Sequence, residues 1–410
     1  MAVRLHAIGQ RSETVRRANL SAIVRELHTS GARSRSELVA RTGLTRSAIR
    51  GLIGEFVAAG LVSEERAAPL GGPGRPSPLV RPNPDSAVVL AVDIAVDSLA
   101  VALIGLGGEV LDIIRVQRPR GHTSVDEIVG KLAELAGVLR ARSGSDSLIG
   151  IGVAVVGVVR RTDGFVSTAP NLGWHDVPLG HRLACALEDV APISVANDAD
   201  LGALAEVRRG VAVGTDDVLY IHGEVGVGGG LIANGRPLTG AAGFGGEVGH
   251  IPVNPGGTAC QCGSVGCWET EVGEEALLRL AGHPPGGGWS EVEAVFEEAR
   301  TGSTIALGAF DALARWMAIG LAGLVNVFNP RLVVLGGMFG RAYPFLIGVL
   351  EAELDKRTLP GPRALVRIVP ASLGVDAPLL GAAELAFEPL LADPARWLRP
   401  RATLAERASA

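Results

Sequence analysis

The feature that most constrains this chain is a cluster of cysteines with one histidine in a glycine-rich stretch. Three of the four cysteines lie within eight residues, at Cys260, Cys262 and Cys267, and His250 stands ten residues before the first of them. Zinc prefers a tetrahedron of four ligands, and three cysteines with one histidine are an ordinary structural set. The neighbouring glycines allow a short loop to turn back so that the four side chains converge. We therefore predict one structural zinc ion per chain, bound by these residues.

A disulfide or a set of free thiols are the alternatives to zinc at this cluster. A disulfide is unfavourable because a Cys-x-Cys spacing strains the bridge, and the arginine-rich first thirty residues lack the apolar core of a secretory signal. Buried free cysteines are common in proteins. Four cysteines in 410 residues fit a reducing compartment, so we expect a cytoplasmic protein. We expect no apolar run to reach the length of a membrane span.

The residues around the cluster resemble the signature of the ROK family, which contains bacterial repressors, reading frames of unknown role and sugar kinases. The matching residues are Glu247-x-x-His250, the loop Asn254-Pro255-x-Gly257-x-x-Cys260-x-Cys262-Gly263-x-x-Gly266-Cys267, and Glu269. In that family the zinc fixes the loop, and the adjacent glutamate and histidine line a sugar pocket. The resemblance thus implies a sugar pocket beside the metal.

Further motifs resemble the sugar side of the same family. Pro170-Asn171-Leu172-Gly173-Trp174 matches one pocket segment, and Ala196-Asn197-Asp198-Ala199-Asp200 matches another, whose aspartate binds a sugar hydroxyl and serves the kinases as base. Sugars are polyols, so a pocket needs converging carboxylates and amides. The resemblance implies sugar binding by Asn171, Asn197, Asp198, Glu247, His250 and Glu269. Asp198 and Asp200 could instead be caps of the helix that follows.

The nucleotide side departs from the family's pattern. The kinases end their first strand in Asp-x-Gly-Gly-Thr, where this chain has Asp93-Ile94-Ala95-Val96-Asp97. Their second phosphate loop is Gly-Thr-Gly-x-Gly-Gly-Gly, and here Glu224 and Val225 replace its first two residues. Carboxylates placed against a triphosphate in a partly buried cleft repel it. The resemblance therefore implies a degenerate kinase body that is not an enzyme, although residual sugar kinase activity is not excluded.

Charge is divided unevenly along the chain. Residues 1–81 hold thirteen arginines, no lysine and six glutamates, a net charge of +7, whereas the remainder carries −12. A basic segment attached to an acidic body favours nucleic acid as the partner of the basic segment alone. A solvated, arginine-rich surface would give the same count.

The basic segment has the pattern of a helix-turn-helix. An apolar face at Leu20, Ile23, Val24 and Leu27 predicts a helix over 13–29. Ser34 and Glu37 form a capping box for a second helix, and Thr45 can cap a third that ends near Ala59. Early residues of the third helix would face base edges in the major groove. We predict that Thr45, Arg46, Ser47 and Arg50 contact DNA, although helical hairpins of this size also occur without DNA.

A stiff segment, Gly71-Gly72-Pro73-Gly74-Arg75-Pro76-Ser77-Pro78, follows a possible winged hairpin. Its Gly-Arg-Pro core presents Arg75 on extended backbone, a shape that enters a narrow minor groove. ROK repressors carry a similar element. A plain interdomain linker is the alternative, and both can hold.

From Ala87 the pattern changes to strands, first at 87–94, then alternating at 99–103, with a third near 109–116, a helix near 124–142 and a strand at 148–156. Strands at 217–222, 227–233 and 332–336 repeat this plan. The resemblance implies an α/β fold: a winged helix-turn-helix followed by an actin-like, two-lobed body with a zinc loop. The predicted domains are a DNA-binding head (1–70), a linker (71–85), a first lobe (86–200), a second lobe (201–392) and a tail (393–410).

These features predict a sugar-responsive transcriptional regulator. Its expected partners are a double-stranded DNA operator, a sugar or sugar-phosphate effector, and further copies of itself as a homodimer or dimer of dimers, without a membrane. The alternative from another class is an ATP-dependent sugar kinase that carries a DNA-binding head. A regulator with a silent pocket that senses a partner protein is a third possibility.

Overall fold

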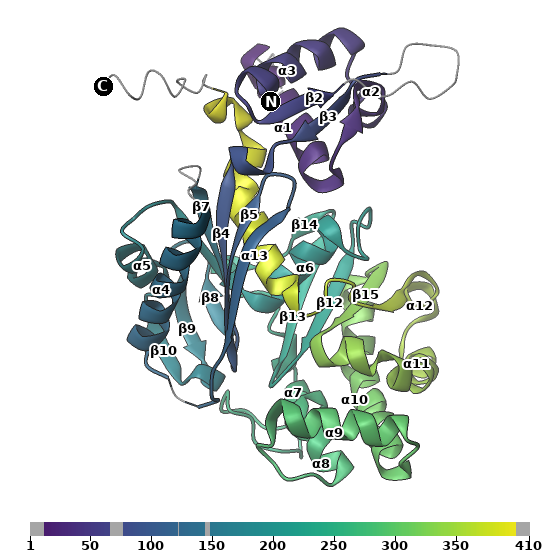
Figure 1. Ribbon diagram of the computed structural model, residues 1–410. Coiled ribbons are helices and arrows are strands. Elements are labelled where there is room, and N and C mark those ends of the chain that lie inside the picture. The colour runs from purple at the N-terminus through teal and green to yellow at the C-terminus, as the bar shows by residue number, and fades with distance from the viewer. Residues whose placement is uncertain (1–11, 66–76, 122, 144–147, 399–410) are drawn as a thin grey trace, which may run out of the picture.

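A small head stands on a larger, two-lobed body in the computed structural model, and a long C-terminal helix runs between them (Figure 1). The structure describes residues 12–65, 77–121, 123–143 and 148–398. Arg75, predicted to enter a minor groove, lies outside these residues.

Within its described residues, the head has three helices and a three-stranded antiparallel sheet in the order β1-β3-β2. Its elements are α1 (Ser12–Ser30), β1 (Arg33–Ser34), α2 (Arg35–Thr42), α3 (Arg46–Ala58), β2 (Val62–Glu65) and β3 (Leu79–Pro82). Local signals determine its helices: Ser34 and Glu37 form the predicted capping box, and Thr45 caps α3. The apolar face predicted for α1 is buried, and so are Ile49, Leu52, Ile53 and Phe56 of α3.

Strand β3 lies inside the stretch that was predicted as a linker over 71–85. Its Val80 is fully buried and pairs with Glu64 of β2 and Arg33 of β1, so β3 forms the middle of the head's sheet. The glycines and prolines of the stretch favoured a linker, whereas Leu79 and Val80 supply an apolar strand that completes the head.

Each lobe of the body is built on a five-stranded sheet, and the two sheets have the same plan. Their orders are β11-β7-β4-β5-β6 and β14-β13-β12-β15-β16. In each sheet, the first three strands of the chain pair antiparallel with one another in sequence. The last two strands pair in parallel on the other side of the first strand. This confirms the topological repeat and the predicted α/β fold.

The strands of the first sheet are β4 (Val88–Ile94), β5 (Ser98–Gly105), β6 (Val110–Gln117), β7 (Leu148–Val155) and β11 (Ile193–Asn197). Those of the second are β12 (Val218–Gly223), β13 (Val227–Ala233), β14 (Arg236–Pro237), β15 (Leu332–Gly336) and β16 (Arg367–Pro370). A small sheet of β8 (Val158–Arg160), β9 (Phe165–Ala169) and β10 (Trp174–Val177) lies beside the first.

The body's helices are α4 (Val125–Ser143), α5 (Leu179–Ala186), α6 (Asp198–Arg209), α7 (Trp268–Val272), α8 (Glu274–Ala281), α9 (Gly288–Arg300), α10 (Thr304–Phe328), α11 (Gly337–Arg357), α12 (Pro360–Leu365) and α13 (Ala377–Ala392). Short 3-10 turns are η1 (Pro84–Ser86), η2 (Pro170–Leu172), η3 (Ala241–Gly243), η4 (Val248–His250), η5 (Gly374–Asp376) and η6 (Pro394–Trp397).

Helix α10 is long and apolar enough to cross a membrane by length and composition, contrary to the expectation from sequence. Its apolar side chains instead belong to the core of the second lobe, where Leu313, Met317 and Leu321 are fully buried. At Gly320 the helix lies directly against the ring of Trp268, since a Cβ there would lie 2.3 Å from that ring. The long apolar stretch of α10 therefore forms a core helix in this protein.

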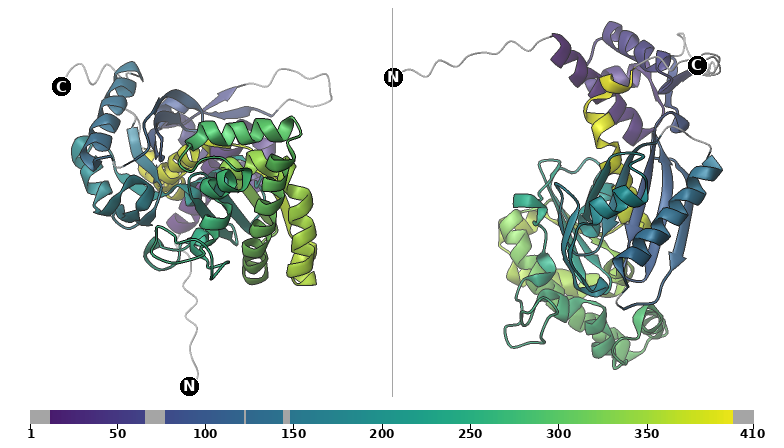
Figure 2. Two further views of the ribbon diagram at one scale, coloured as in Figure 1. Left: turned by 90° about the horizontal axis from the view of Figure 1, so that it is seen from below. Right: turned by 90° about the vertical axis from the view of Figure 1, so that its left-hand side faces the viewer.

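Helix α13 falls within the predicted second lobe but packs against the first sheet and α6. A Cβ at Gly152 of β7 would lie 1.8 Å from the carbonyl oxygen of Ala382, so glycine permits the close contact. The far end of α13 and η6 reach the head, and α13 stands between head and body in the side view (Figure 2). One apolar core joins Leu27 of α1, Phe387 of α13 and Leu201 of α6.

Candidate functional site

The predicted zinc ligands converge in the loop between η4 and α7. One ligand atom from each of His250, Cys260, Cys262 and Cys267 lies within 4.8 Å of all the others. The Sγ atoms of Cys262 and Cys267 are 3.6 Å apart, and Nδ1 of His250 is 3.8 Å from Sγ of Cys260. A tetrahedral zinc with bonds of about 2.3 Å to sulfur separates two sulfurs by about 3.8 Å. The donor set and its spacing therefore fit a closed structural zinc site.

Two glycines allow the loop to fold this tightly. Gly263 and Gly266 both have positive φ, at 90° and 69°. A Cβ at Gly266 would lie 1.5 Å from the carbonyl oxygen of Asn254, so no other residue fits there. The backbone N–H of Cys260 donates to the carbonyl of Ser264, and that of Gly263 donates to the carbonyl of Cys260, which closes a narrow turn that carries two of the cysteines.

A cavity of about 90 Å³ opens beside this loop in the cleft between the lobes. All six residues predicted to bind sugar line it: Asn171, Asn197, Asp198, Glu247, His250 and Glu269. They come from η2, the junction of β11 with α6, η4 and α7, which are distant in sequence. The structure thus brings together carboxylates, amides and an imidazole, the groups that a polyol pocket needs.

In the first turn of α6, the carboxylate of Asp198 lines this cavity and is not the N-cap of the helix. Asn197, rather than Asp198 or Asp200, is the N-cap, because its Oδ1 accepts hydrogen bonds from the amides of Ala199 and Asp200. Its Nδ2 donates to the carbonyl of Gly157. The side chain of Asn197 is therefore engaged in positioning the helix, and the carboxylate of Asp198 remains available to a ligand.

Two other carboxylates are held near the metal loop. Glu269 Oε2 accepts the backbone N–H of Val227 at 3.0 Å, which fixes the glutamate against β13. Burial raises the pKa of Glu247 to about 7 and, despite the nearby His222, that of Asp198 to about 6. Carboxyl groups with such pKa values can accept or donate hydrogen bonds to hydroxyls near neutral pH.

His222 also lines the cavity and was missed from sequence. It is the penultimate residue of β12, is almost fully buried, and its Nδ1 lies 3.0 Å from the hydroxyl of Tyr220. Its Nε2 lies 3.3 Å from Oε1 of Glu224. The sequence signal that could have identified His222 is its position near the end of a buried strand, where the cleft opens.

A second cavity of about 360 Å³ adjoins the first and shares Asp198, His222 and Glu224 with it. Asp97 and Glu224, the residues that replace the phosphate-binding pattern, both line it. Asp93 also lines this cavity and is 5 % exposed, and burial together with neighbouring Glu224 raises its pKa to about 8.

Arginines in that cavity are already paired with carboxylates. Arg120 donates to both oxygens of Glu274 and, at 3.1 Å, to Asp97. Arg115 donates to Asp376 at 2.6 Å. These pairs connect the first lobe to the segments that follow in the second, and they leave no described arginine of the cavity free for a phosphate, because Arg341 pairs with Glu293.

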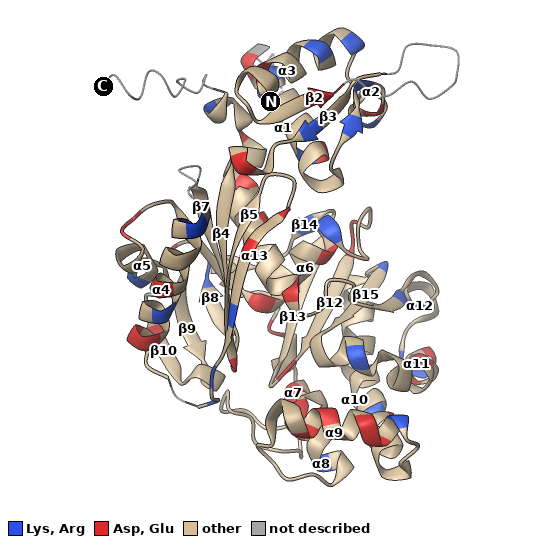
Figure 3. Cartoon of the chain, in the orientation of Figure 1, with Lys and Arg blue, Asp and Glu red and all other residues tan. Residues whose placement is uncertain are grey.

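The predicted DNA-contacting residues lie together at the start of α3. Thr45, Arg46, Ser47 and Arg50 are all exposed. The hydroxyl of Thr45 accepts the amide N–H of Ala48, so Thr45 primarily caps the helix. Neither Arg46 nor Arg50 forms an ion pair with another described residue. Figure 3 shows basic residues on α3 and β3 of the head, whereas acidic residues are spread over the elements of the body.

Comparison with known proteins gives two groups of relatives. The model of the ROK family matches residues 89–388. The xylose repressor of Bacillus subtilis is 27 % identical over 383 residues, which cover 92 % of this chain and 97 % of the repressor. The glucokinase of Halalkalibacterium halodurans is 31 % identical over 310 residues, which cover 71 % of this chain and 92 % of that enzyme.

Solved structures fall into the same groups. A transcriptional regulator homologous to the E. coli MLC protein superposes with a TM-score of 0.73 at 25 % identity, covering 94 % of this chain and 97 % of the regulator. A glucokinase from Streptomyces griseus, in complex with glucose and AMPPNP, gives a TM-score of 0.64 at 29 % identity, covering 74 % of this chain and all of the enzyme. The B. subtilis repressor and the MLC homologue thus match nearly the whole chain, and the two glucokinases match about the share that the body makes up.

Proposed function

This chain belongs to the ROK family, and from that premise we propose that it is a sugar-responsive DNA-binding regulator, most simply a repressor of carbohydrate metabolism genes. What supports the proposal is a head with a helix-turn-helix pattern on a body with two adjoining cavities, one lined by all six residues expected to bind sugar and the other lined by carboxylates where kinases of the family hold phosphates. The near full-length similarity to xylose repressors supports it.

The head supplies the DNA-binding surface in this proposal. Arg46 and Arg50 are exposed near the N-terminus of α3, the part of a recognition helix that meets base edges. An arginine can bond a guanine in bidentate fashion, and a two-fold dimer would place two such helices on the half-sites of an operator. The net charge of the first 81 residues, +7, adds attraction to phosphates.

We expect Arg50→Ala to weaken binding to the preferred DNA site by about 1–3 kcal/mol and to relax base preference at one position, since a bidentate contact is lost. The site would first be selected from a random duplex library with the parent protein. Arg236→Ala, which removes an exposed arginine from the body, is the matched control. Unchanged affinity and base preference in Arg50→Ala would remove this residue from the reading surface.

The zinc loop has a structural role in the proposal. When bound, the metal would hold His250, Cys260, Cys262 and Cys267 with no open position, and it would fix the loop that carries His250 into the cavity. It supplies rigidity and takes no part in a reaction.

We expect protein purified without chelator to contain one zinc per chain, measured by elemental analysis. Cys262→Ala should lose most of the metal and melt at a lower temperature, because metal binding contributes to folding. Cys185→Ala is the control, since Cys185 is a free cysteine outside the cluster. A parent protein without zinc, or a Cys262→Ala variant with full zinc content, would contradict the assignment.

A second candidate function is an ATP-dependent sugar kinase with a DNA-binding head. The glucokinase relatives and the free carboxylate of Asp198, which could serve as base, favour it. The acidic phosphate half opposes it.

The proposal for a regulator also includes a cytoplasmic location and assembly as a homodimer or a higher oligomer.

A further inference from the structure

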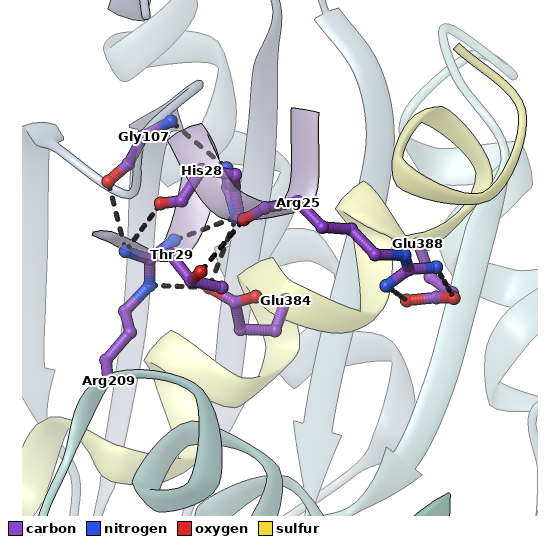
Figure 4. Close-up of polar contacts among 7 residues, drawn as sticks. All are labelled: Arg25, His28, Thr29, Gly107, Arg209, Glu384 and Glu388. Carbon is purple, nitrogen blue, oxygen red and sulfur yellow. Dashed lines mark hydrogen bonds and ion pairs between the residues drawn. The ribbon is translucent and has the colours of Figure 1, made fainter. Parts of the chain in front are cut away.

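A buried polar network lies where the head meets the body, away from the sugar cavity (Figure 4). His28 of α1 is fully buried, and its Nε2 is 3.3 Å from Oε1 of Glu384 on α13. The amide of Gly107, in the turn between β5 and β6, donates to Nδ1 of His28 at 3.0 Å. Arg209, the last residue of α6, joins all three. We call His28, Gly107, Arg209 and Glu384 the latch.

Arg209 forms hydrogen bonds with each of the other three residues of the latch. Its Nε donates to Glu384 Oε1, and its Nη1 donates to the backbone carbonyls of His28 and Gly107 at 3.2 and 3.0 Å. One guanidinium thus bonds the head, the first lobe and α13 at once. The fit is close, because a Cβ at Gly108 would lie 2.0 Å from Arg209 Cζ.

The charge of Glu384 depends on these partners. The residue is 3 % exposed, and burial alone would raise its pKa, but hydrogen bonds from His28 and Arg209 and the positive charge of Arg209 lower that pKa to about 2. A buried carboxylate is stable only while it is paired. The latch therefore has a well-defined hydrogen-bonded state. Small displacements of Arg209 are sufficient to break its hydrogen bonds, since these weaken steeply with distance and angle.

Helix α6 connects the latch to the sugar cavity. Its first residue, Asp198, lines the cavity, and its last, Arg209, lies in the latch, about 16 Å away along a helix that rises about 1.5 Å per residue. Neighbouring elements pack closely against the helix along its length. A Cβ at Gly381 of α13 would lie 1.9 Å from the carbonyl of Leu201, and one at Gly202 would lie 2.7 Å from the ring of Tyr220.

We propose that α6 transmits sugar binding to the DNA-binding head as a rigid element, with Arg209 as the residue through which the position of α6 sets the position of α1. The inference rests on the proposed function, in which a sugar bonds to Asp198. A sugar that shifts the N-terminus of α6 shifts Arg209 by a similar amount, so sugar binding changes the balance between latched and released heads. Arg209 is a positioning residue and touches neither ligand.

The chain offers a matched control for this role. Arg25 of α1 also joins the head to α13, through an ion pair with Glu388, and Ser21 donates to the carbonyl of Leu391. These contacts attach the head to the body without involving α6. Removing Arg25 should therefore loosen docking of the head in general but leave the path from the cavity intact.

The test compares the parent, the double variant Arg209→Gln/Glu384→Gln and the control Arg25→Gln. The double change removes both buried charges together and so avoids an unpaired carboxylate. Operator affinity is measured without sugar and with saturating D-xylose or D-glucose, and sugar affinity is measured with and without operator. Coupled sites typically change each other's affinity by about 5- to 150-fold, and by the same factor in both directions.

We expect the double variant to bind sugar and operator separately about as well as the parent, with the coupling factor reduced toward 1. Arg25→Gln should keep the parent's factor. Hydrogen exchange of α1 amides should be faster in the double variant and no longer respond to sugar, a change that a merely structural role of Arg209 in α6 would not produce.

Two results would overturn the inference. One is a double variant that keeps the parent's coupling factor, and the other is an equal loss in Arg25→Gln, which would assign the effect to general docking of the head. A parent protein that binds its operator but responds to neither sugar would instead remove the proposed function, and the coupling with it. The failures are therefore distinguishable.

Discussion

Asp198→Ala is expected to weaken sugar binding by about 10- to 150-fold, because hydrogen bonds to a charged group contribute about 1.5–3 kcal/mol. Asn197 holds the first turn of α6, so the carboxylate of Asp198 has no capping duty and is free to bond a hydroxyl in the cavity. Calorimetric titration with D-glucose and D-xylose, the sugars suggested by the relatives, measures the loss.

The same variant should bind operator DNA normally in the absence of sugar and release it only at much higher sugar concentration. Asp85→Ala, which removes an exposed aspartate outside the cavity, is the control. An Asp198→Ala protein that binds sugar as tightly as the parent would show that the cavity beside the metal loop is not the effector site.

Local signals in the sequence were sufficient for the helices of the head and for most strands of the body. Ser34 and Thr45 act within four residues of themselves, so their capping roles follow from sequence alone. The buried strands of the body are continuous apolar runs. The site residues were placed by resemblance to family motifs, and the structure brings all six into one cavity.

Longer-range relationships could not be predicted in this way. His28 and Glu384 are 356 positions apart, and no pattern near either one indicates that they meet. The same reason explains the position of α13: its sequence predicts a helix but not which sheet it covers. The role of Asn197 as the N-cap of α6 was also not predicted, because two aspartates follow it within three residues and each is an equally good cap by residue type.

The carboxylates in the second cavity are the reason why we propose a regulator rather than a kinase. Phosphoryl transfer depends on cations and backbone amides that hold the phosphates and neutralise charge as it develops. Here Asp97 and Glu224, which replace a threonine and a glycine of the kinase pattern, line that half of the cleft. Arg120, which could otherwise meet a phosphate, is paired with Glu274 and Asp97.

We therefore expect no sugar-dependent ATP turnover above background, where a kinase of this type would turn over at about 1–100 per second. A coupled assay with glucose and xylose measures it, with a glucokinase from the family as the positive control. Sugar binding itself should persist in the same preparation, which rules out an unfolded sample.

A variant that restores the kinase pattern tests whether the acidic side chains are the reason. Replacing Ala95 and Val96 by glycine, Asp97 by threonine, Glu224 by glycine and Val225 by threonine removes two carboxylates and opens both loops. We expect it to bind AMPPNP more tightly than the parent, because the repulsion is lost. Phosphorylation of glucose or xylose by the parent itself, abolished by Asp198→Ala, would instead establish the kinase, since that result requires both a held triphosphate and a carboxylate base at Asp198.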